Sequence, residues 1–451
     1  VSMTELLSML TTTLYEGGSM KKTIGFIIIL VLMAFALFSL RSSFKEYGVT
    51  VKDGSIKTQV LYKGLNNSVD FTKDNEGNYY IAFKDRIQYI DKAGRAFNIF
   101  INKNLSITSL DYNKKTLYYA SGTRVYSYNL ISKENKEIIK NIPNYGDYNK
   151  SLIRINGDYL FVTIGSATNS GVVGLDNKWL DNYPQNHDIT PKSITIKGIN
   201  FAGVKTGAFV PYLTRNVKGQ IITQHVIGNS SIIVYNLKTG AQGKFAWGIR
   251  NMTGIDFNSE GKVLVIVGGM EARGLRAVKG DSDYIYKIKK NEWYGFPDYS
   301  GGDPISSPKF TDLFNKPIPA ILDNHPTINP PAPIYQHKSV NSLISLAIDT
   351  KGIFGDKDCI YFYEKNDNSI YSLNKNSALK EKVKFESGAY ISSIKFFDNL
   401  IILDSKNGYL ISIEKCKSSN ISSGIGEFYY FLLTIVTTLI VVILVDLRKK
   451  N

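Results

Sequence analysis

The sequence predicts an all-β fold, a six-bladed β-propeller flanked by one transmembrane helix at each end. Two observations predict it: a strand-turn-strand pattern that recurs along the chain, and an uncharged apolar run near each end. The pattern is clearest in four segments: Gly77 to Gly94, Lys115 to Leu130, Asp358 to Ser377 and Asp398 to Lys415. Helical periodicity is nearly absent between the two apolar runs, so we expect few helices there.

The repeated pattern favours a propeller over other β folds. Each copy alternates β-branched and aromatic residues around Asp, Asn, Gly or Lys turns, as half-buried antiparallel strands require. The stretches "NGDYLFVTIG" and "GKVLVIVGG" are similar to further first halves. Small antiparallel sheets that repeat in this way close radially into a propeller, and six of them suit the length. A double β-sandwich is the alternative, but it does not explain why the pattern returns near both ends.

The apolar runs are Thr23 to Leu40 and Phe428 to Val445. As helices at about 1.5 Å per residue, each would span roughly 27 Å, which is enough to cross a bilayer. Tyr429 and Tyr430 stand where an interfacial aromatic belt would lie. Two buried core helices are the alternative interpretation, and uncharged runs of this length fit it poorly.

Flanking charges predict the topology of a two-pass protein of the cell membrane. Lys21 and Lys22 precede the first run, and a basic tail follows the second, so the positive-inside bias places both tails in the cytoplasm. Arg41 and Lys45 argue weakly for the opposite orientation. No small-residue cleavage site follows the first run, so we expect an uncleaved anchor. The predicted parts are cytoplasmic tails at 1–22 and 446–451, spans at 23–40 and 428–445, and an extracytoplasmic propeller at 42–422.

We expect residues 1–19 to precede the true start of translation. The chain begins with Val, as a GTG initiator gives on conceptual translation, and "EGGSM" can be encoded by a ribosome-binding site followed by ATG. "MKK" before an apolar run is a normal start for an exported bacterial chain, so we expect Met20 to be the first residue. An amphipathic cytoplasmic extension is the competing interpretation.

Composition limits the partners of the chain. The formal net charge is +15 and the pI is about 9.3, but no basic run with interleaved aromatic residues suggests a nucleic-acid groove. For an exterior domain, the membrane surface and a sugar or cell-wall glycan are the expected partners. Cys359 and Cys416 either pair within the closing blade or remain free thiols, and no C-x-x-C-H motif exists for haem attachment.

The stretch from Phe245 to Pro304 differs from the rest, because Trp, Arg, Gly and Pro crowd together there. Its "WGIRNMTGIDF", "GKVLVIVGG" and "DSDYIYKIKKNEWYGFPDYSGGDP" resemble the glucose/sorbosone dehydrogenase family, whose members use pyrroloquinoline quinone (PQQ). "TIGSATNSGVVGLDNKWL" and "HPTINPPAPIYQH" are similar to two further segments of that family. The resemblance covers roughly Tyr145 to Asp358, and it implies a six-bladed propeller with the cofactor across the end of the central channel.

The resemblance implies a set of site residues. Arg250 and Asn251 match the Arg-Asn pair that contacts PQQ and substrate, and Gly269 and Met270 fall where main-chain carbonyls hold a calcium ion. The family's general base is a His, and its position falls on or near Tyr148. A phenol has an unperturbed pKa of about 10 and is a poor base near neutrality. His187, in a loop, is the other residue that could take the proton.

Two classes of function therefore stay open. One is a membrane-anchored sugar dehydrogenase that oxidises an aldose or related sugar hydroxyl with PQQ outside the cell. The other is a catalytically degenerate propeller that binds a glycan or a protein at the cell surface. Hydrolase chemistry has no support, because the sequence contains no G-x-S-x-G motif and no Cys-His arrangement.

Overall fold

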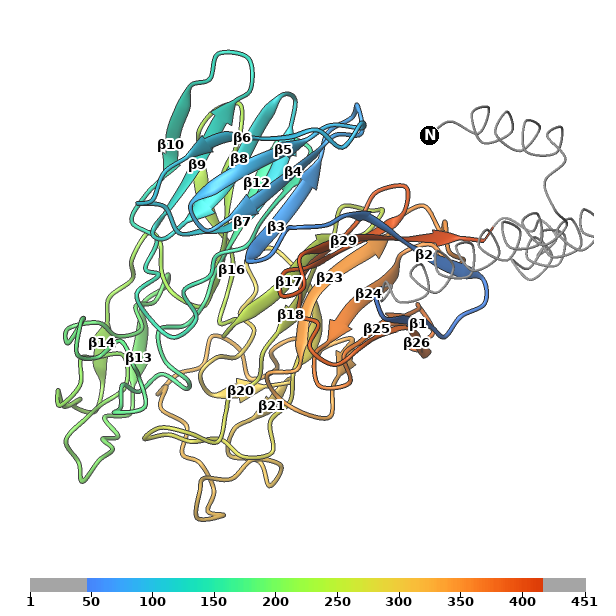
Figure 1. Cartoon of the computed structure of the whole chain (residues 1–451). Helices are drawn as coiled ribbons and strands as arrows, with labels where there is room; N and C mark the ends of the chain where they lie inside the picture. Colours follow the sequence, from blue (N-terminus) through green and yellow to red (C-terminus); the bar gives the residue numbers. More distant parts are fainter. Residues whose placement is uncertain (1–46, 417–451) are drawn as a thin grey trace, which may run out of the picture. The chain divides into compact units, whose positions relative to one another are not determined.

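The computed structural model describes residues 47–416, and residues 49–416 form one compact unit. Within the described range, the regular elements are all β-strands, and six sheets of four or five strands account for most of them (Figure 1). The predicted six-bladed propeller is therefore confirmed. The predicted spans at 23–40 and 428–445 and both tails lie outside the described residues. No helix in residues 47–416 is long and apolar enough to cross a membrane.

Each blade is an antiparallel sheet. Its strands run in chain order from the channel outward, except for the outermost strands of the last two blades, which come from the start of the domain. Blade 1 consists of β3 (Ser68–Lys73), β4 (Tyr79–Phe83), β5 (Arg86–Ile90) and β6 (Ala96–Ile101). Blade 2 consists of β7 (Ile107–Asn113), β8 (Thr116–Ser121), β9 (Arg124–Asn129) and β10 (Asn135–Ile139). Blade 3 consists of β11 (Ile153–Asn156), β12 (Tyr159–Ile164), β15 (Ser231–Asn236) and β16 (Gln242–Trp247). Blade 4 consists of β17 (Met252–Phe257), β18 (Val263–Val267), β19 (Tyr284–Ile288) and β22 (Tyr335–Gln336). Blade 5 consists of β23 (Leu343–Asp349), β24 (Cys359–Glu364), β25 (Ser369–Leu373) and β26 (Leu379–Phe385), and β1 (Val49–Val51) pairs with β26 at its outer edge. Blade 6 consists of β27 (Ile391–Phe396), β28 (Leu400–Asp404), β29 (Tyr409–Lys415) and β2 (Ile56–Tyr62).

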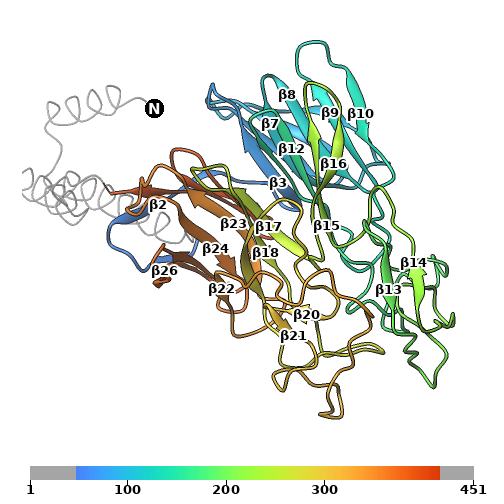
Figure 2. The ribbon, with the colours of Figure 1, turned by 180° about the vertical axis from the view of Figure 1, so that it is seen from behind.

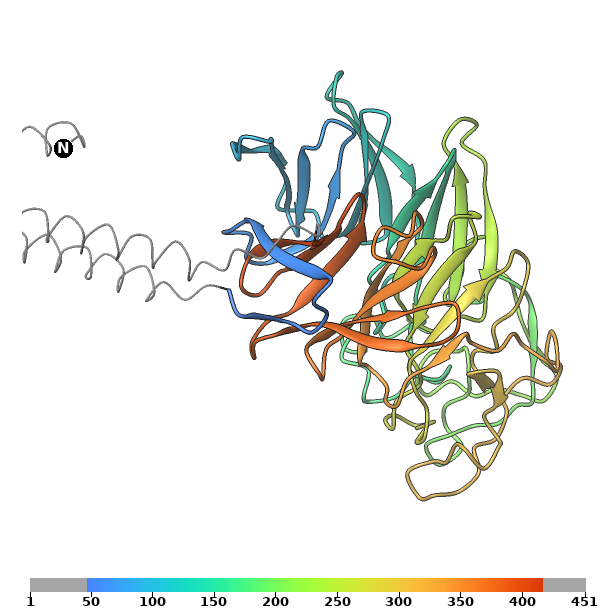
Figure 3. The same ribbon diagram turned by 90° about the vertical axis from the view of Figure 1, so that its right-hand side faces the viewer.

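The ring is closed by strand β2, which comes from the start of the domain and pairs with β29 at its end. The two strands are antiparallel, with Ile56 opposite Lys415, and they lie side by side in Figure 3. The last blade is thus built from both ends of the propeller. Backbone hydrogen bonds within this blade therefore hold the N-terminal strand of the ring to the C-terminal one.

The strand-turn-strand segments of the sequence are the second and third strands of blades 1, 2, 5 and 6. All residues of β4, β18, β24 and β28 are buried, because each of these strands packs against neighbouring blades on both faces. Strands buried on both faces read as continuous apolar or aromatic runs rather than as strict alternation. "NGDYLFVTIG" and "GKVLVIVGG" supply the corresponding second strands, β12 and β18, of blades 3 and 4.

A buried carboxylate ties the inner strands together in the channel. Asp70 on β3 accepts hydrogen bonds from the Ser109 hydroxyl of blade 2 and the Ser393 hydroxyl of blade 6, at 2.9 and 2.6 Å. Its oxygens also lie 3.5 Å from Lys395 Nζ and from an Arg154 nitrogen. Asp70 of blade 1 thereby contacts blades 2, 3 and 6.

Two long excursions leave the same side of the propeller, one from blade 3 and one from blade 4 (Figures 1 and 2). The first carries the hairpin of β13 (Ile194–Ile196) and β14 (Gln220–Ile222), and the second carries β20 (Tyr299–Ser300) and β21 (Asp303–Pro304). They share a hydrophobic cluster and a bridge between Ile196 and Leu322. The Trp- and Pro-rich part of the sequence therefore packs the two excursions against each other.

Candidate functional site

Two predicted site residues meet at one end of the propeller. Tyr148 lies in the connection from β10 to β11, and Arg250 lies in the connection from β16 to β17. The guanidinium lies over the phenol ring, with Cζ 4.2 Å from the ring centroid. The sequence separation of these residues gave no sign of this contact, but the family resemblance placed both at the channel end, and they do lie together.

The Arg250 guanidinium is enclosed by protein acceptors. Its side chain is 5% exposed. Nε donates to the Asn169 carbonyl at 2.8 Å, and Nη1 donates to the Gly268 carbonyl at 3.0 Å. Nη2 faces three acceptors, which are the Tyr148 hydroxyl, Asn169 Oδ1 and Glu271 Oε1. All three nitrogens of this guanidinium therefore have partners within the protein.

The Tyr148 hydroxyl also makes every hydrogen bond that it can. It donates to Glu271 Oε1 at 2.6 Å and accepts from Arg250 and from Arg273, the latter at 2.9 Å. Burial, opposed by the charge of Arg250, raises the pKa of the phenol to about 12. A neutral hydroxyl with one donor and two acceptor contacts has no free lone pair with which to take a proton from a substrate.

Arg273 extends this group of side chains into a larger charge cluster that sequence reasoning missed. Its guanidinium lies 2.7 Å from Asp147, 2.6 Å from Asp176 and 3.2 Å from Glu271. Although burial alone would raise the pKa of Glu271, the Tyr148 hydrogen bond and the two Arg charges bring that pKa below its usual value. The sequence contains both charged residues, Asp176 in "TIGSATNSGVVGLDNKWL" and Arg273 in "MEARG". Only the fold brings them into contact.

The other predicted site residues, Asn251, Gly269 and Met270, make hydrogen bonds through their backbone groups, next to the start of β17 and the end of β18. The Asn251 carbonyl accepts the Gly268 amide hydrogen at 2.8 Å. The amides of Gly269 and Met270 donate to Asp283 and Asp281, at 3.1 and 2.6 Å. A Cβ on Gly269 would come 2.1 Å from the Ser282 carbonyl oxygen, so glycine is required there for close backbone packing.

The predicted calcium ligands are the main-chain carbonyls of Gly269 and Met270. The presence or absence of clustered acidic, His or Cys side chains does not test such ligands. Across residues 47–416, no three or more His, Cys, Asp or Glu side chains are grouped so that they could hold a metal ion. The Tyr284 hydroxyl donates to Asp281 at 2.7 Å. Calcium binds six to eight oxygen ligands, so two carbonyls alone would not form a site.

The residues around Arg250 do not fit an anionic cofactor in this arrangement. PQQ is a tricarboxylate, whereas the cluster contains three carboxylates (Asp147, Asp176 and Glu271) against two guanidinium groups (Arg250 and Arg273). The excess charge is therefore negative, and Glu271 Oε1 already lies 3.2 Å from Nη2 of Arg250. A further carboxylate at this point would be repelled.

The remaining candidates lie elsewhere. His187 Nδ1 lies 2.9 Å from the Gln185 carbonyl, and no hydrogen bond within the described residues joins it to Tyr148 or Arg250. Cys359 is buried and Cys416 is exposed, and both are free thiols. Of the two open readings of the cysteines, the structure matches the one with separate thiols.

Comparison with known proteins gives a match at the level of structure. No family model matches the sequence, and no curated protein matches it either. Among solved structures, the holo form of the PQQ domain of a pyranose dehydrogenase from Coprinopsis cinerea is similar, with a TM-score of 0.54 at 11% identity over 82% of this chain and 98% of that one. A calcium structure of a carbohydrate-active enzyme from Trichoderma reesei matches over the same shares, with a TM-score of 0.55 at 13% identity.

A bacterial enzyme gives the same result. The apo form of a soluble aldose sugar dehydrogenase from Escherichia coli has a TM-score of 0.51 at 11% identity, over 80% of this chain and 100% of that one. At such low identity these matches establish the shared fold. The chain has the six-bladed propeller fold found in PQQ-dependent sugar dehydrogenases.

Proposed function

We propose that the chain is a non-redox propeller that binds a glycan at the end of its channel. The observation that carries the proposal is the closed pair of Arg250 and Tyr148. The related enzymes need an open Arg for the cofactor and a base for the sugar hydroxyl. Here the guanidinium is occupied by four residues of the protein, and the phenol is a donor to Glu271 with a pKa raised to about 12 by burial.

The surface beside this pair suits a carbohydrate. Tyr145 and Tyr183 are 44% and 48% exposed, and their ring centroids are 5.3 Å apart. Tyr145 is two residues from Asp147, which accepts hydrogen bonds from Arg273 and from the Trp179 indole at 2.7 and 2.8 Å. Exposed aromatic faces next to charged hydrogen-bonding groups can stack on a sugar ring and bind its hydroxyls. The predicted spans would hold the propeller outside the cell, where it would meet surface glycans.

The second candidate is a membrane-anchored sugar dehydrogenase with PQQ and calcium. One specific observation favours it: Arg250 and Asn251, the pair that the family uses for cofactor and substrate, lie at the channel end of the same fold. This candidate requires Glu271 to release Arg250 when the cofactor binds. It also requires a base other than Tyr148.

Calorimetric and absorbance titration of the full-length chain with PQQ and calcium separates the two candidates. We expect no binding and no oxidation of added aldoses. In parallel, titration with β-1,4-linked glucose and N-acetylglucosamine oligosaccharides should show binding that Tyr183→Ala weakens by about tenfold, as the loss of a stacked aromatic ring predicts. Saturable PQQ binding with aldose oxidation would establish the dehydrogenase instead.

A further inference from the structure

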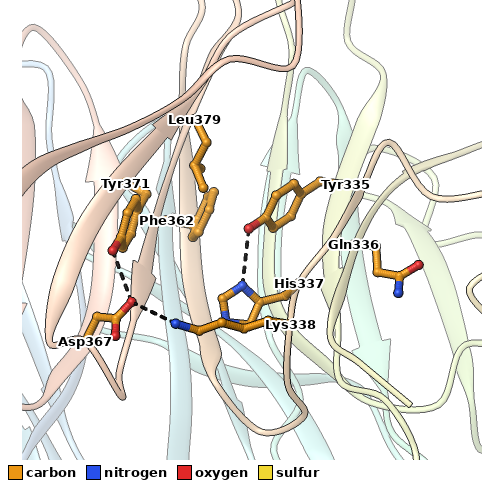
Figure 4. Close-up of a pocket in the computed structure, with 8 residues that line it drawn as sticks. All are labelled: Tyr335, Gln336, His337, Lys338, Phe362, Asp367, Tyr371 and Leu379. Atoms are coloured by element: carbon orange, nitrogen blue, oxygen red, sulfur yellow. Dashed lines mark hydrogen bonds and ion pairs between the residues drawn. The ribbon is translucent and has the colours of Figure 1, made fainter. Parts of the chain in front are cut away.

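A hollow lies on the outer rim of the propeller, between the outer strands of blades 4 and 5. It has a volume of about 400 Å³, within the range of small-molecule sites. Figure 4 shows its lining: Tyr335, Gln336, His337, Lys338, Phe362, Asp367, Tyr371 and Leu379. None of these residues belongs to the cluster of Arg250 and Tyr148.

The hollow exists because the outer strands of the two blades differ in length. Strand β22 of blade 4 has two residues, whereas β26 of blade 5 has seven. Nearer the channel the two blades are packed together by a hydrophobic cluster that includes Ile285 and Phe362. Beyond it, the short β22 leaves the outer part of blade 5 uncovered, and Leu379 there is 42% exposed.

Aromatic rings form one wall of the hollow. Phe362 and Tyr371 are paired across β24 and β25, so their side chains share one face of the sheet, with ring centroids 6.0 Å apart and planes 20° apart. Tyr335 reaches in from blade 4, with its ring centroid 5.6 Å from that of Phe362. In Figure 4, Tyr371 and Tyr335 stand on either side of Phe362, and Leu379 lies next to it.

Polar groups run along the adjacent side. Asp367 Oδ2 accepts from the Tyr371 hydroxyl at 3.1 Å and lies 3.4 Å from Lys338 Nζ. The Tyr335 hydroxyl and His337 Nδ1 are 3.2 Å apart (Figure 4). Asp367 Oδ1 accepts no hydrogen bond within residues 47–416. The hollow therefore offers a carboxylate oxygen and an ammonium group whose charges cancel.

We propose that this hollow binds one pyranose ring of a neutral glycan. A pyranose has an apolar C–H face that can lie on the partly exposed ring of Tyr371, which the buried Phe362 ring supports from behind. Its hydroxyls can donate to Asp367 and accept from Lys338. A charged ligand gains little here, because Asp367 and Lys338 already neutralise each other. The site lies outside the proposed channel-end site, and it requires no redox chemistry.

The test is calorimetric titration of the full-length chain with cellotetraose and with the tetramer of N-acetylglucosamine. Tyr371→Ala should weaken binding of at least one of them by about tenfold, from the loss of stacking and of buried apolar area. Tyr371→Phe keeps the ring and should stay within about threefold of the unmodified chain. Tyr159→Ala is the matched control, because Tyr159 is 48% exposed on blade 3, and it should change nothing.

The remaining variants separate the rim site from the channel-end site. Asp367→Asn should weaken binding as well, because the sugar hydroxyl loses a charged acceptor. A ligand that only stacks on the aromatic rings would bind this variant and the unmodified chain equally. Equal binding by Tyr371→Ala and the unmodified chain, or no binding of either tetramer, would overturn the rim site. If Tyr183→Ala abolishes binding and Tyr371→Ala does not, the channel-end proposal stands and the rim proposal fails. The reverse pattern supports the rim site alone.

Discussion

Arg250 and Tyr148 form one packed unit in which the guanidinium both stacks on the phenol ring and donates to its oxygen. They come from connections that flank opposite sides of blade 3. Their contact therefore bridges the loops of two blade junctions. Any change in either side chain should alter the stability of this end of the propeller as well as its binding properties.

Arg250→Ala should lower the free energy of unfolding by about 3 to 5 kcal/mol, because the Asn169 and Gly268 carbonyls and Asn169 Oδ1 lose a buried charged donor. Urea unfolding followed by circular dichroism measures the change. Arg95→Ala is the matched control. Its side chain is 84% exposed and pairs with Asp91, so the expected loss is below about 1 kcal/mol. Similar values for the two variants would mean that Arg250 does not hold the loops together.

The Tyr148 phenol should stay protonated until strongly alkaline pH. Its pKa is raised to about 12, so the folded state holds the proton more tightly than the unfolded state does. The stability that this adds is present in full below pH 10 or so and is lost as the pH rises towards 12. The difference in ultraviolet absorbance between the unmodified chain and Tyr148→Phe should show no phenolate below about pH 11. A phenolate near neutral pH would revive Tyr148 as a base.

How far the sequence predicts this molecule depends on how local each feature is. The second strands, such as Tyr79–Phe83 and Leu400–Asp404, are continuous buried runs next to turn residues, so they could be recognised one by one. The closing strand Ile56–Tyr62 could not be recognised in this way, because its partner is at the other end of the domain. Pairing over such a separation depends on closure of the whole ring, which no local pattern encodes.

The candidate site also depends on contacts between distant parts of the chain, which a local sequence pattern does not reveal. The resemblance indicated Arg250 and Tyr148 individually, but it did not indicate that Glu271 and Arg273 would enclose them. Those two residues follow β18, in "MEARG", and no family motif or repeat singles them out. Their role comes from three loops that the fold brings to one point. A local sequence pattern cannot distinguish a solvated charge from a buried one.

Asp188 should make stability fall as the pH rises from about 4 to about 6. This carboxyl is 1% exposed, and burial raises its pKa to about 6 despite hydrogen bonds from Thr168 and Ala167. Above pH 4 the unfolded state has lost the proton while the folded state still holds it, so deprotonation favours unfolding. Relative to Asp188→Asn, the unmodified chain should lose up to about 3 kcal/mol across this range. Urea unfolding at several pH values measures the difference, and a constant difference would contradict the assignment.

Gly269→Ala should destabilise the domain by about 2 to 3 kcal/mol, because the new Cβ meets a backbone oxygen that cannot rotate away. Gly243→Ala is the matched control on β16, since a Cβ there meets nothing within 4 Å. We expect that control to be neutral or slightly stabilising. Thermal unfolding of the two variants side by side gives the comparison. Equal melting temperatures would show that the loop after β18 can shift to make room.

The closing pair of strands also sets how the domain responds to a pull on its two ends. Because β2 and β29 are antiparallel and Ile56 faces Lys415, a force that separates these ends would load one backbone pair at a time rather than the whole ladder at once. Before it reached β2, that force would have to detach β1 from β26, where Val49 faces Phe385. The three residues of β1 therefore act as a first point of resistance, and the ring would open at its last blade while blades 1 to 4 stayed folded.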